Sequence, residues 1–200
     1  MDLPTLYQNS KEARLRFVEG ASLRFDTFPD YLGYEIIPVI WDCWPRYVEN
    51  MAKWFHKHKV QTAFFTSSQT AERMRSLCPN VNINHLPEAI ETELYHAGKP
   101  LSERSIDYLE FGRCSRILDS TQFDKSIIVL SSRNERTGLK TRAQLADALA
   151  DSKITLALTR LDNQPELAEG VDTLTQRYWE CMLSGVVILG RAPQELIDII

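Results

Sequence analysis

The sequence predicts an α/β fold made of two consecutive units, each built on a parallel β-sheet. Short runs rich in β-branched and apolar residues, typical of buried strands, alternate along the chain with segments of helical periodicity. This alternation stops at a polar stretch containing Gly and Pro, residues 97–104, and then begins again. The chain has 200 residues, 44% of them hydrophobic, which is enough for two small domains with real cores.

The first unit, residues 1–98, is expected to contain a strand–helix–strand–helix–strand series. Its predicted strands are residues 35–41, 61–66 and 81–86, and its predicted helices are residues 45–59 and 67–77. Pro38 fits an edge strand or a bulge, because proline cannot donate a ladder hydrogen bond. Ser67 or Ser68 is expected to cap the second helix, which ends before Cys78-Pro79.

The second unit, residues 99–200, repeats the pattern. Its predicted strands are residues 106–111, 126–130, 153–158 and 186–189. Thr141 is expected to cap a helix that runs to about Ala150, and residues 161–170 are expected to form a polar loop. The apolar end of the chain leads us to expect that the natural protein continues beyond Ile200.

The last helix of the second unit carries the clearest local pattern. Thr173 and Gln176 have the spacing of a capping box, and Gly185 is suited to end the helix. The spacing predicts an apolar stripe of Leu174, Tyr178, Cys181 and Met182. It predicts an opposite row of Thr173, Arg177, Glu180 and Ser184.

Composition excludes several classes of protein. The net charge of −4 argues against a general nucleic-acid binder. No apolar run approaches eighteen residues, so no transmembrane segment is expected, although peripheral membrane contact stays open. The first twenty residues lack the apolar core of a secretory signal. The four cysteines are scattered and form no CxxC pair, so we expect free thiols and a cytoplasmic protein.

Polar residues that follow the predicted strands are the first candidates for a site, since ligands of open α/β sheets bind at the carboxyl ends of strands. They are Asp42, Ser67, Ser68, Arg113, Ser131, Ser132, Arg133, Thr159 and Arg160. The free N–H groups at the start of the last helix could hold a phosphate, and Arg113 could bind it bidentately. Glu180 could accept hydrogen bonds from sugar or ribose hydroxyls. Together these features fit a nucleoside diphosphate.

Each candidate also has a plainer interpretation. Arg177 and Glu180 are three residues apart and could form only a surface ion pair. Arg113 could solvate a loop, and Asp42 could cap the helix that follows it. The sequence contains no GxGxxG, P-loop, HExxH or GxSxG motif, so the common signatures of dinucleotide, NTPase, zinc-protease and hydrolase sites are missing.

The segment from Leu174 to Glu195 resembles the donor-binding end of group 1-like glycosyltransferases of the GT-B type. Asp172 and Glu180 have the acid–x7–Glu spacing of that family, with Asp in the first place. The segment 106–113 resembles the first strand of its second domain and the Gly-Arg that follows. Weaker similarities are found in residues 64–68 and 85–88.

The resemblance implies two Rossmann-like units that move a sugar from a nucleotide-sugar donor to an unidentified acceptor. The second unit would bind the donor through Arg113, Asp172, Thr173, Thr175, Arg177 and Glu180, with Glu180 on the ribose. The first unit would bind the acceptor, and Asp42 is the candidate catalytic base. Neither a cofactor nor a metal is expected, and the chain has no DxD triplet.

The chain also departs from that family. A Gly-rich phosphate loop is missing from the first unit, and residues 1–34 resemble a shortened or truncated first domain. Enzymes of this type are much longer, so we expect this chain to be incomplete. Two alternatives therefore stay open: a non-catalytic nucleotide- or phosphate-binding α/β protein, and a nucleotide-sugar epimerase of the same fold.

Overall fold

The computed structural model describes residues 13–19, 35–41, 43–112, 119–132 and 139–200. The chain forms two compact units, one of residues 1–87 and 164–173, the other of residues 88–163 and 174–200. The first crossing between them, at Pro87 and Glu88, lies ahead of the polar stretch 97–104. The return of residues 164–173 to the first unit has no counterpart in the sequence pattern.

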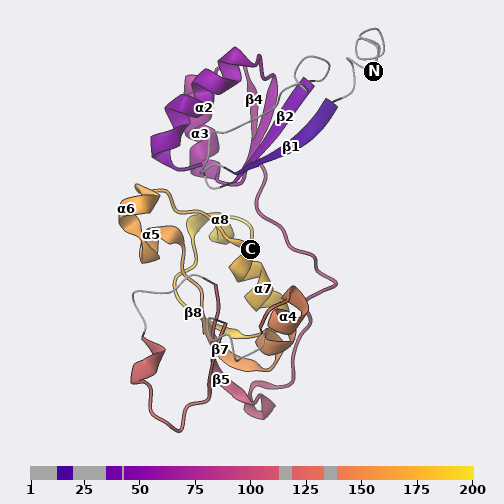
Figure 1. Ribbon diagram of the computed structural model, residues 1–200, viewed down its shortest axis with the longest axis vertical. Helices are drawn as coiled ribbons and strands as arrows, with labels where there is room; N and C mark the ends of the chain where they lie inside the picture. The colour runs from indigo at the N-terminus through magenta and orange to yellow at the C-terminus, as the bar shows by residue number, and fades with distance from the viewer. Residues whose placement is uncertain (1–12, 20–34, 42, 113–118, 133–138) are drawn as a thin grey trace. The chain divides into compact units, whose positions relative to one another are not determined.

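The first unit contains a four-stranded parallel sheet in the order β1-β2-β3-β4. The strands are β1 (Ala13–Glu19), β2 (Glu35–Trp41), β3 (Thr62–Phe65) and β4 (Asn82–His85). Helices α2 (Pro45–Lys57) and α3 (Ser68–Leu77) connect the last three. Successive right-handed crossovers in one direction place both helices on the same face of the sheet, as Figure 1 shows.

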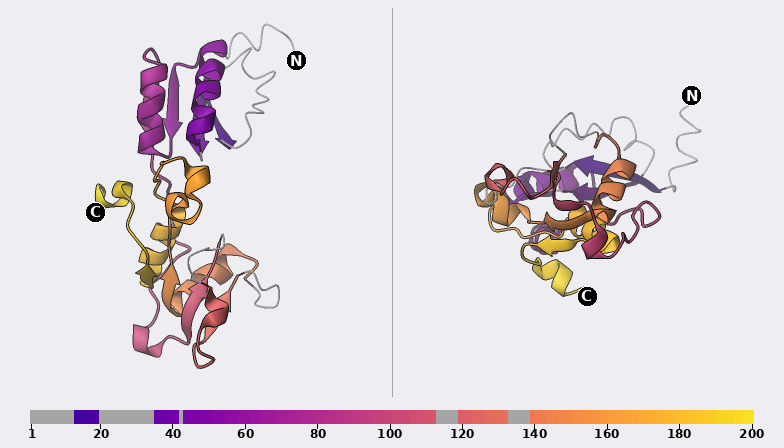
Figure 2. Two further views of the ribbon diagram at one scale, coloured as in Figure 1. Left: turned by 90° about the vertical axis from the view of Figure 1, so that its left-hand side faces the viewer. Right: turned by 90° about the horizontal axis from the view of Figure 1, so that it is seen from below.

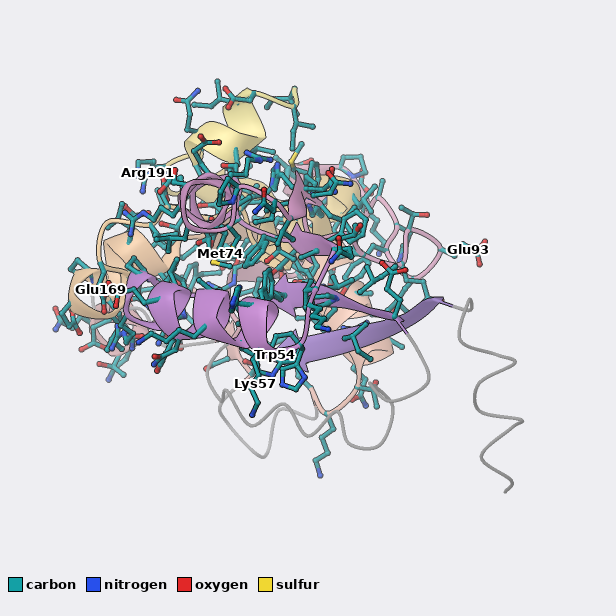
Figure 3. The ribbon with its side chains drawn as sticks, turned by 90° about the horizontal axis from the view of Figure 1, so that it is seen from above. Trp54, Lys57, Met74, Glu93, Glu169 and Arg191 are labelled. Atoms are coloured by element: carbon teal, nitrogen blue, oxygen red, sulfur yellow. The ribbon has the colours of Figure 1, made fainter. Side chains whose placement is uncertain are left out.

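The core of this unit lies between the two helices and the sheet. Met51, Phe55, Phe65 and Met74 have no exposed surface. Figure 3 shows Met74 directed inward and Lys57 directed away from the fold, and the left view of Figure 2 shows the two helices side by side. Ser67 caps α3, because its Oγ accepts a hydrogen bond from the Thr70 N–H at 3.3 Å, which confirms that prediction.

Two features of the first sheet differ from expectation. Strand β1 was missed, although Leu15 and Phe17 alternate with Arg14 and Arg16 in its sequence and Gly20 follows it. Its presence makes β2 an inner strand, so Pro38 is not on an edge strand. The proline is tolerated because the ladder between β2 and β3 pairs only Val39 and Ile40, the residues that follow it.

The second unit contains a four-stranded parallel sheet whose order, β6-β5-β7-β8, does not follow the chain. The strands are β5 (Ile106–Glu110), β6 (Val129–Ser131), β7 (Ser152–Leu156) and β8 (Val187–Leu189). The chain leaves β5 toward β6, crosses back to β7 on the other side of β5, and continues to β8. This reversal of direction is the switch point of a Rossmann-like sheet.

Helices α4 (Arg142–Ala150) and α7 (Gln176–Ser184) cover one face of this sheet. They share a core with Leu109 and Phe111 of the β5 region. Thr141 and Gln144 form a capping box at the start of α4, so the predicted cap at Thr141 is confirmed. On the opposite face the ring of Phe123, from the connection between β5 and β6, packs edge-on against Tyr108 at 5.2 Å.

Several connections contain more structure than their sequences suggest. The stretch expected as a loop, residues 161–170, includes most of the short helix α5 (Arg160–Asn163) and all of the short helix α6 (Pro165–Ala168). The remaining short elements are η2 (Leu101–Glu103), η3 (Ser120–Gln122) and α8 (Gln194–Ile197). Within the described parts of the chain, no helix combines the length and the apolar character needed to cross a membrane.

Candidate functional site

The strand order of the second unit points to one place for a ligand. Open α/β sheets bind ligands just beyond the carboxyl ends of their strands. The binding point lies between two neighbouring strands whose connections lead to opposite edges of the sheet. Here that place lies beyond the ends of β5 and β7, at Glu110 and Leu156. A pocket is present there.

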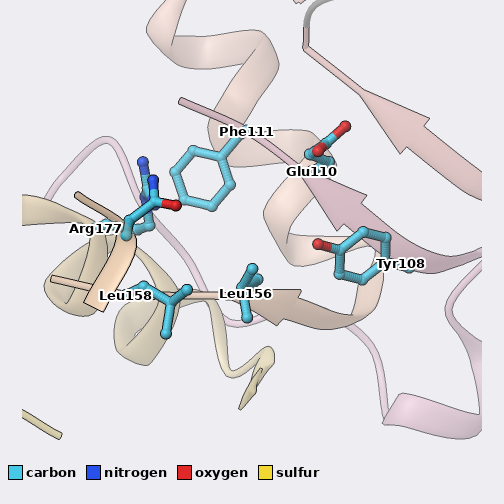
Figure 4. Close-up of a pocket in the computed structure, with 7 residues that line it drawn as sticks. Tyr108, Glu110, Phe111, Leu156, Leu158 and Arg177 are labelled. Atoms are coloured by element: carbon cyan, nitrogen blue, oxygen red, sulfur yellow. The ribbon is translucent and has the colours of Figure 1, made fainter. Parts of the chain in front are cut away.

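Among the residues that the structure describes, seven of the second unit line this pocket, which we call the switch-point pocket. They are Tyr108, Glu110, Phe111, Leu156, Leu158, Asn163 and Arg177 (Figure 4). Its empty volume is about 270 Å³, including space open to solvent. Because this figure includes open solvent, it is not the volume of an enclosed cavity, and the enclosed space itself is small.

Arg177 brings positive charge to the pocket from the first turn of α7. Its guanidinium lies over the ring of Phe111, with Cζ 5.1 Å from the ring centroid, so a cation–π contact orients it. A β-carbon built on Gly112 would lie 2.2 Å from Nη2 of Arg177. Glycine at this position therefore makes room for the guanidinium at the carboxyl end of β5.

The carboxylate of Glu110 reaches the same pocket from the end of β5. Its Oε2 accepts a hydrogen bond from Ser131 Oγ at 3.0 Å, and these two residues are register partners on β5 and β6. Because side chains alternate along a strand, Glu110 and Tyr108 project from one face while Phe111 projects from the face that carries α7. Figure 4 shows Phe111 between Arg177 and Glu110 in that view. The pocket thus offers a cation and a carboxylate from opposite faces of the sheet.

The start of α7 differs from the predicted capping box, which is wrong. The helix begins at Gln176 with Thr175 as its N-cap residue, whose side chain makes no capping hydrogen bond. The Gln176 N–H donates to Glu88 Oε2 at 3.1 Å, and the Gln176 side chain donates to the carbonyl of Ala89. The Leu174 N–H donates to Glu195 Oε2 at 2.7 Å. The carboxylates of Glu88 and Glu195 therefore accept hydrogen bonds from N–H groups that were expected to bind a phosphate.

Glu180 lies one turn further along α7, outside the set of residues that line the pocket. Its Oε1 accepts a hydrogen bond from the Tyr95 hydroxyl at 2.6 Å. Burial, together with this bond to Glu180, raises the pKa of Tyr95 well above its ordinary value. The contact that the structure describes for Glu180 is therefore a hydrogen bond within the protein, with Tyr95. Of the predicted apolar stripe, Leu174, Tyr178 and Cys181 are buried as expected, but Met182 is 42% exposed. Ser184, which was predicted on the opposite row, is buried.

Asp172 and Thr173, the other predicted donor-binding residues, belong to the first unit. Asp172 is buried, and its N–H donates to Gln69 Oε1 at 3.2 Å. The acid–x7–Glu pair of the sequence is therefore divided between the two units, with Glu180 in the second.

A second polar cluster, of which the sequence analysis singled out only Thr159, lies beyond the ends of β7 and β8. Arg191 Nη2 and Nε both lie 2.9 Å from Asp162 Oδ1, and Thr159 Oγ1 donates to Asp162 Oδ2 at 3.0 Å. Arg191 lies two residues after the end of β8, and Thr159 lies three residues after the end of β7, so the rule that selects polar residues after strands could have found Arg191 as well. Figure 3 shows Arg191 at the periphery of the fold.

Three of the predicted residues, Asp42, Arg113 and Arg133, lie outside the described residues. Of the described cysteines, Cys43, Cys78 and Cys181 are free thiols. Burial raises the pKa of Cys43 and of Cys181 to about 12, so neither thiol is poised as a nucleophile. The described residues contain no group of three or more His, Cys, Asp or Glu arranged to hold a metal ion.

Comparison with models of known protein families and with curated protein sequences found no match to this chain. We therefore infer a function from the residues that line the switch-point pocket.

Proposed function

We propose that the second unit binds the nucleoside-diphosphate part of a nucleotide sugar at the switch-point pocket, and that the protein is a glycosyltransferase. The observation that carries this proposal is the position of Arg177, whose guanidinium is oriented over Phe111 beyond the carboxyl ends of β5 and β7. A planar guanidinium held in one orientation is suited to bidentate binding of phosphate.

Arg177 would act on the departing diphosphate. When the bond from the sugar to the diphosphate breaks, negative charge develops on the leaving group, and a positioned cation stabilises it without further reorganisation. The proposal assigns this charge stabilisation to arginine side chains, Arg177 and Arg113, rather than to a metal ion. The acceptor and its catalytic base are assigned to the first unit, with Asp42 as the candidate base.

One observation favours a second candidate, a nucleotide-binding protein without transferase activity. The N–H groups of Leu174 and Gln176 at the start of α7 are bonded to Glu195 and Glu88. A transferase that used the helix N-terminus to stabilise its leaving group would need those donors for phosphate. A pure binding protein would need only the pocket.

A thermal-shift screen with nucleoside diphosphates and nucleotide sugars tests the binding site. One ligand is expected to stabilise the wild type by about 2.7 kcal/mol at roughly 100 times its dissociation constant. Arg177→Ala should lose this shift. Arg73→Ala, which removes an exposed arginine of α3, should keep it. The absence of a shift with every ligand would contradict the proposal.

NMR of the bound nucleotide sugar then separates the activities. Release of the nucleoside diphosphate together with appearance of the sugar on an added acceptor identifies a transferase, whereas release with free sugar is hydrolysis by water. Conversion to an isomeric nucleotide sugar identifies an epimerase, and an unchanged ligand identifies a binding protein.

A further inference from the structure

The switch-point pocket contains a carboxylate that the sequence analysis did not single out, Glu110. Its register partner on β6, Ser131, donates a hydrogen bond to Oε2. This bond holds the carboxylate at the end of β5, and the two oxygens of a carboxylate can together accept about four hydrogen bonds. The side chain is half-buried and lines the pocket.

The two charged groups of the pocket restrict its ligand. Arg177 attracts an anionic group, whereas Glu110 repels anions and can only accept hydrogen bonds when ionised. A ligand that satisfies both must carry negative charge at one end and hydrogen-bond donors at the other. A phosphorylated sugar or a nucleotide has this arrangement, because its hydroxyls lie a few bonds from its phosphates.

We propose that Glu110 is the residue that binds a vicinal diol of the ligand, with one carboxylate oxygen accepting from each of two neighbouring hydroxyls. This inference rests on the proposed function, and it assigns to Glu110 the hydroxyl-binding role that the sequence suggested for Glu180. An O–H donor to a carboxylate forms a short, strong hydrogen bond, and acids beyond strand ends bind ribose in this way in dinucleotide-binding sheets.

The contacts of Glu180 support this assignment. Its carboxylate bonds the Tyr95 hydroxyl, and it does not line the pocket, whereas Glu110 does. Tyr108, two residues before Glu110 on the same face of β5, also lines the pocket. In Figure 4 its hydroxyl points into the space between Phe111 and Leu156, where it can bond a further hydroxyl of the ligand.

The test measures affinity by calorimetry for uridine, guanosine and adenosine diphosphates, for their 2′-deoxy forms, and for UDP-glucose and GDP-mannose. The wild type is expected to bind one ribonucleotide series best. Glu110→Gln should weaken that binding roughly tenfold or more, since it removes a hydrogen bond to a charged group. Glu93→Gln, at an exposed glutamate directed away from the fold (Figure 3), should change nothing.

The ligand series identifies the source of the diol. If it is the ribose, the wild type prefers the ribonucleoside diphosphate over its 2′-deoxy form, and Glu110→Gln loses the preference. If it is the transferred sugar, Glu110→Gln weakens only the nucleotide sugar. Ser131→Ala, which removes the hydrogen bond that holds Glu110, should reproduce part of either effect should Glu110→Gln fold poorly.

Two results overturn the inference alone: unchanged affinity in a folded Glu110→Gln, or loss of the ribose preference in Glu180→Gln instead. Failure of the wild type to bind any of the nucleotides overturns the proposed function, and this inference with it.

Discussion

The guanidinium of Arg177 occupies the space that a side chain on Gly112 would need, with Nη2 only 2.2 Å from the position of such a β-carbon. Gly112 ends the β5 segment with φ at +73°, a conformation that glycine adopts at little cost. The two residues are far apart in sequence, yet each sets the environment of the other. The charge of the switch-point pocket therefore depends on a glycine as well as on an arginine.

Replacing Gly112 by alanine should weaken ligand binding and also lower the free energy of unfolding. The positive φ alone should cost about 1–2 kcal/mol in the free energy of unfolding, and the added methyl group should displace the guanidinium. Urea denaturation and nucleotide affinity measure the two effects. We expect affinity to fall about as far as it does in Arg177→Ala.

Gly170→Ala is the matched control for this change. Gly170 has φ at +82°, but nothing lies within 4 Å of a β-carbon built there. The variant should show a similar loss of stability with unchanged nucleotide affinity. Equal affinity in the Gly112 and Gly170 variants would show that Arg177 does not bind the nucleotide from its present position.

The hydrogen bond between Tyr95 and Glu180 should contribute to stability. Tyr95 is 6% exposed and its hydroxyl lies 2.6 Å from Glu180 Oε1, so the bond is short and charge-assisted. Tyr95→Phe and Glu180→Gln should each lower the free energy of unfolding by about 1–2 kcal/mol. Chemical denaturation of both variants and of the double variant gives the coupling energy, for which a value near zero would contradict the contact.

Arg104 should be one of the most sensitive positions in the second unit. It is 5% exposed, and its guanidinium donates to three backbone carbonyls, those of Lys99, Ser152 and Ser184. Arg104→Met should cost about 3 kcal/mol or more, because buried carbonyls lose their donors. Arg73→Met in α3, at an exposed position, should change the urea midpoint little. If the two substitutions lowered the urea midpoint equally, the stabilising role of the Arg104 hydrogen bonds would be contradicted.

Lowering the pH should reduce the stability of the second unit, in part because the Asp107 carboxylate becomes protonated. Hydrogen bonds from Lys153 Nζ, at 2.7 Å, and from the Ile128 N–H hold the pKa of Asp107 below its ordinary value. A folded-state pKa below the unfolded one gives stability that is complete above the unfolded value, near 4, and disappears as the pH falls through the folded value.

Urea denaturation from about pH 6 to about pH 2 measures this contribution. The wild type should be more stable than Asp107→Asn at the upper end, and the difference should shrink as the pH falls. Glu93→Gln, at an exposed glutamate, serves as the control and should run parallel to the wild type. A constant difference for Asp107→Asn would show that the carboxylate has the same pKa in both states.

The sequence was a good guide wherever a few neighbouring residues decide the structure. Strand β2 spans Glu35–Trp41 as predicted, and Ser67 and Thr141 cap their helices. Gly185 ends α7 in the left-handed conformation, with φ at +62°. These features depend on turn chemistry and on local hydrogen bonds, which short segments carry with them.

The start of α7 shows where local patterns were insufficient. Thr173 and Gln176 have the spacing of a capping box, but helix formation begins only at Gln176. The N–H groups there are bonded to Glu88 and Glu195, residues distant in sequence. A distant carboxylate that satisfies the same donor removes the advantage of the local cap, and no pattern within the segment reveals it.

The candidate site divides in the same way. The sequence selected Arg177 by its place on a helix and selected Ser131 by its place after a strand, and Arg177 lines the pocket while Ser131 holds one of its residues. Glu110 and Asn163 were not selected, since neither has a distinctive spacing. Glu180 was selected by spacing, yet its described partner is Tyr95.

The amino-acid sequence by itself determined the α/β class, most of the strands and helices, and the caps that begin or end them, because hydrophobic periodicity and turn residues act over short stretches. Only the tertiary structure decided the order β6-β5-β7-β8, and with it which strand ends meet. Strand pairing is a contact between segments far apart in the chain, so the meeting of Glu110 with Ser131 and of Arg177 with Gly112 follows from burial and backbone pairing across the whole unit.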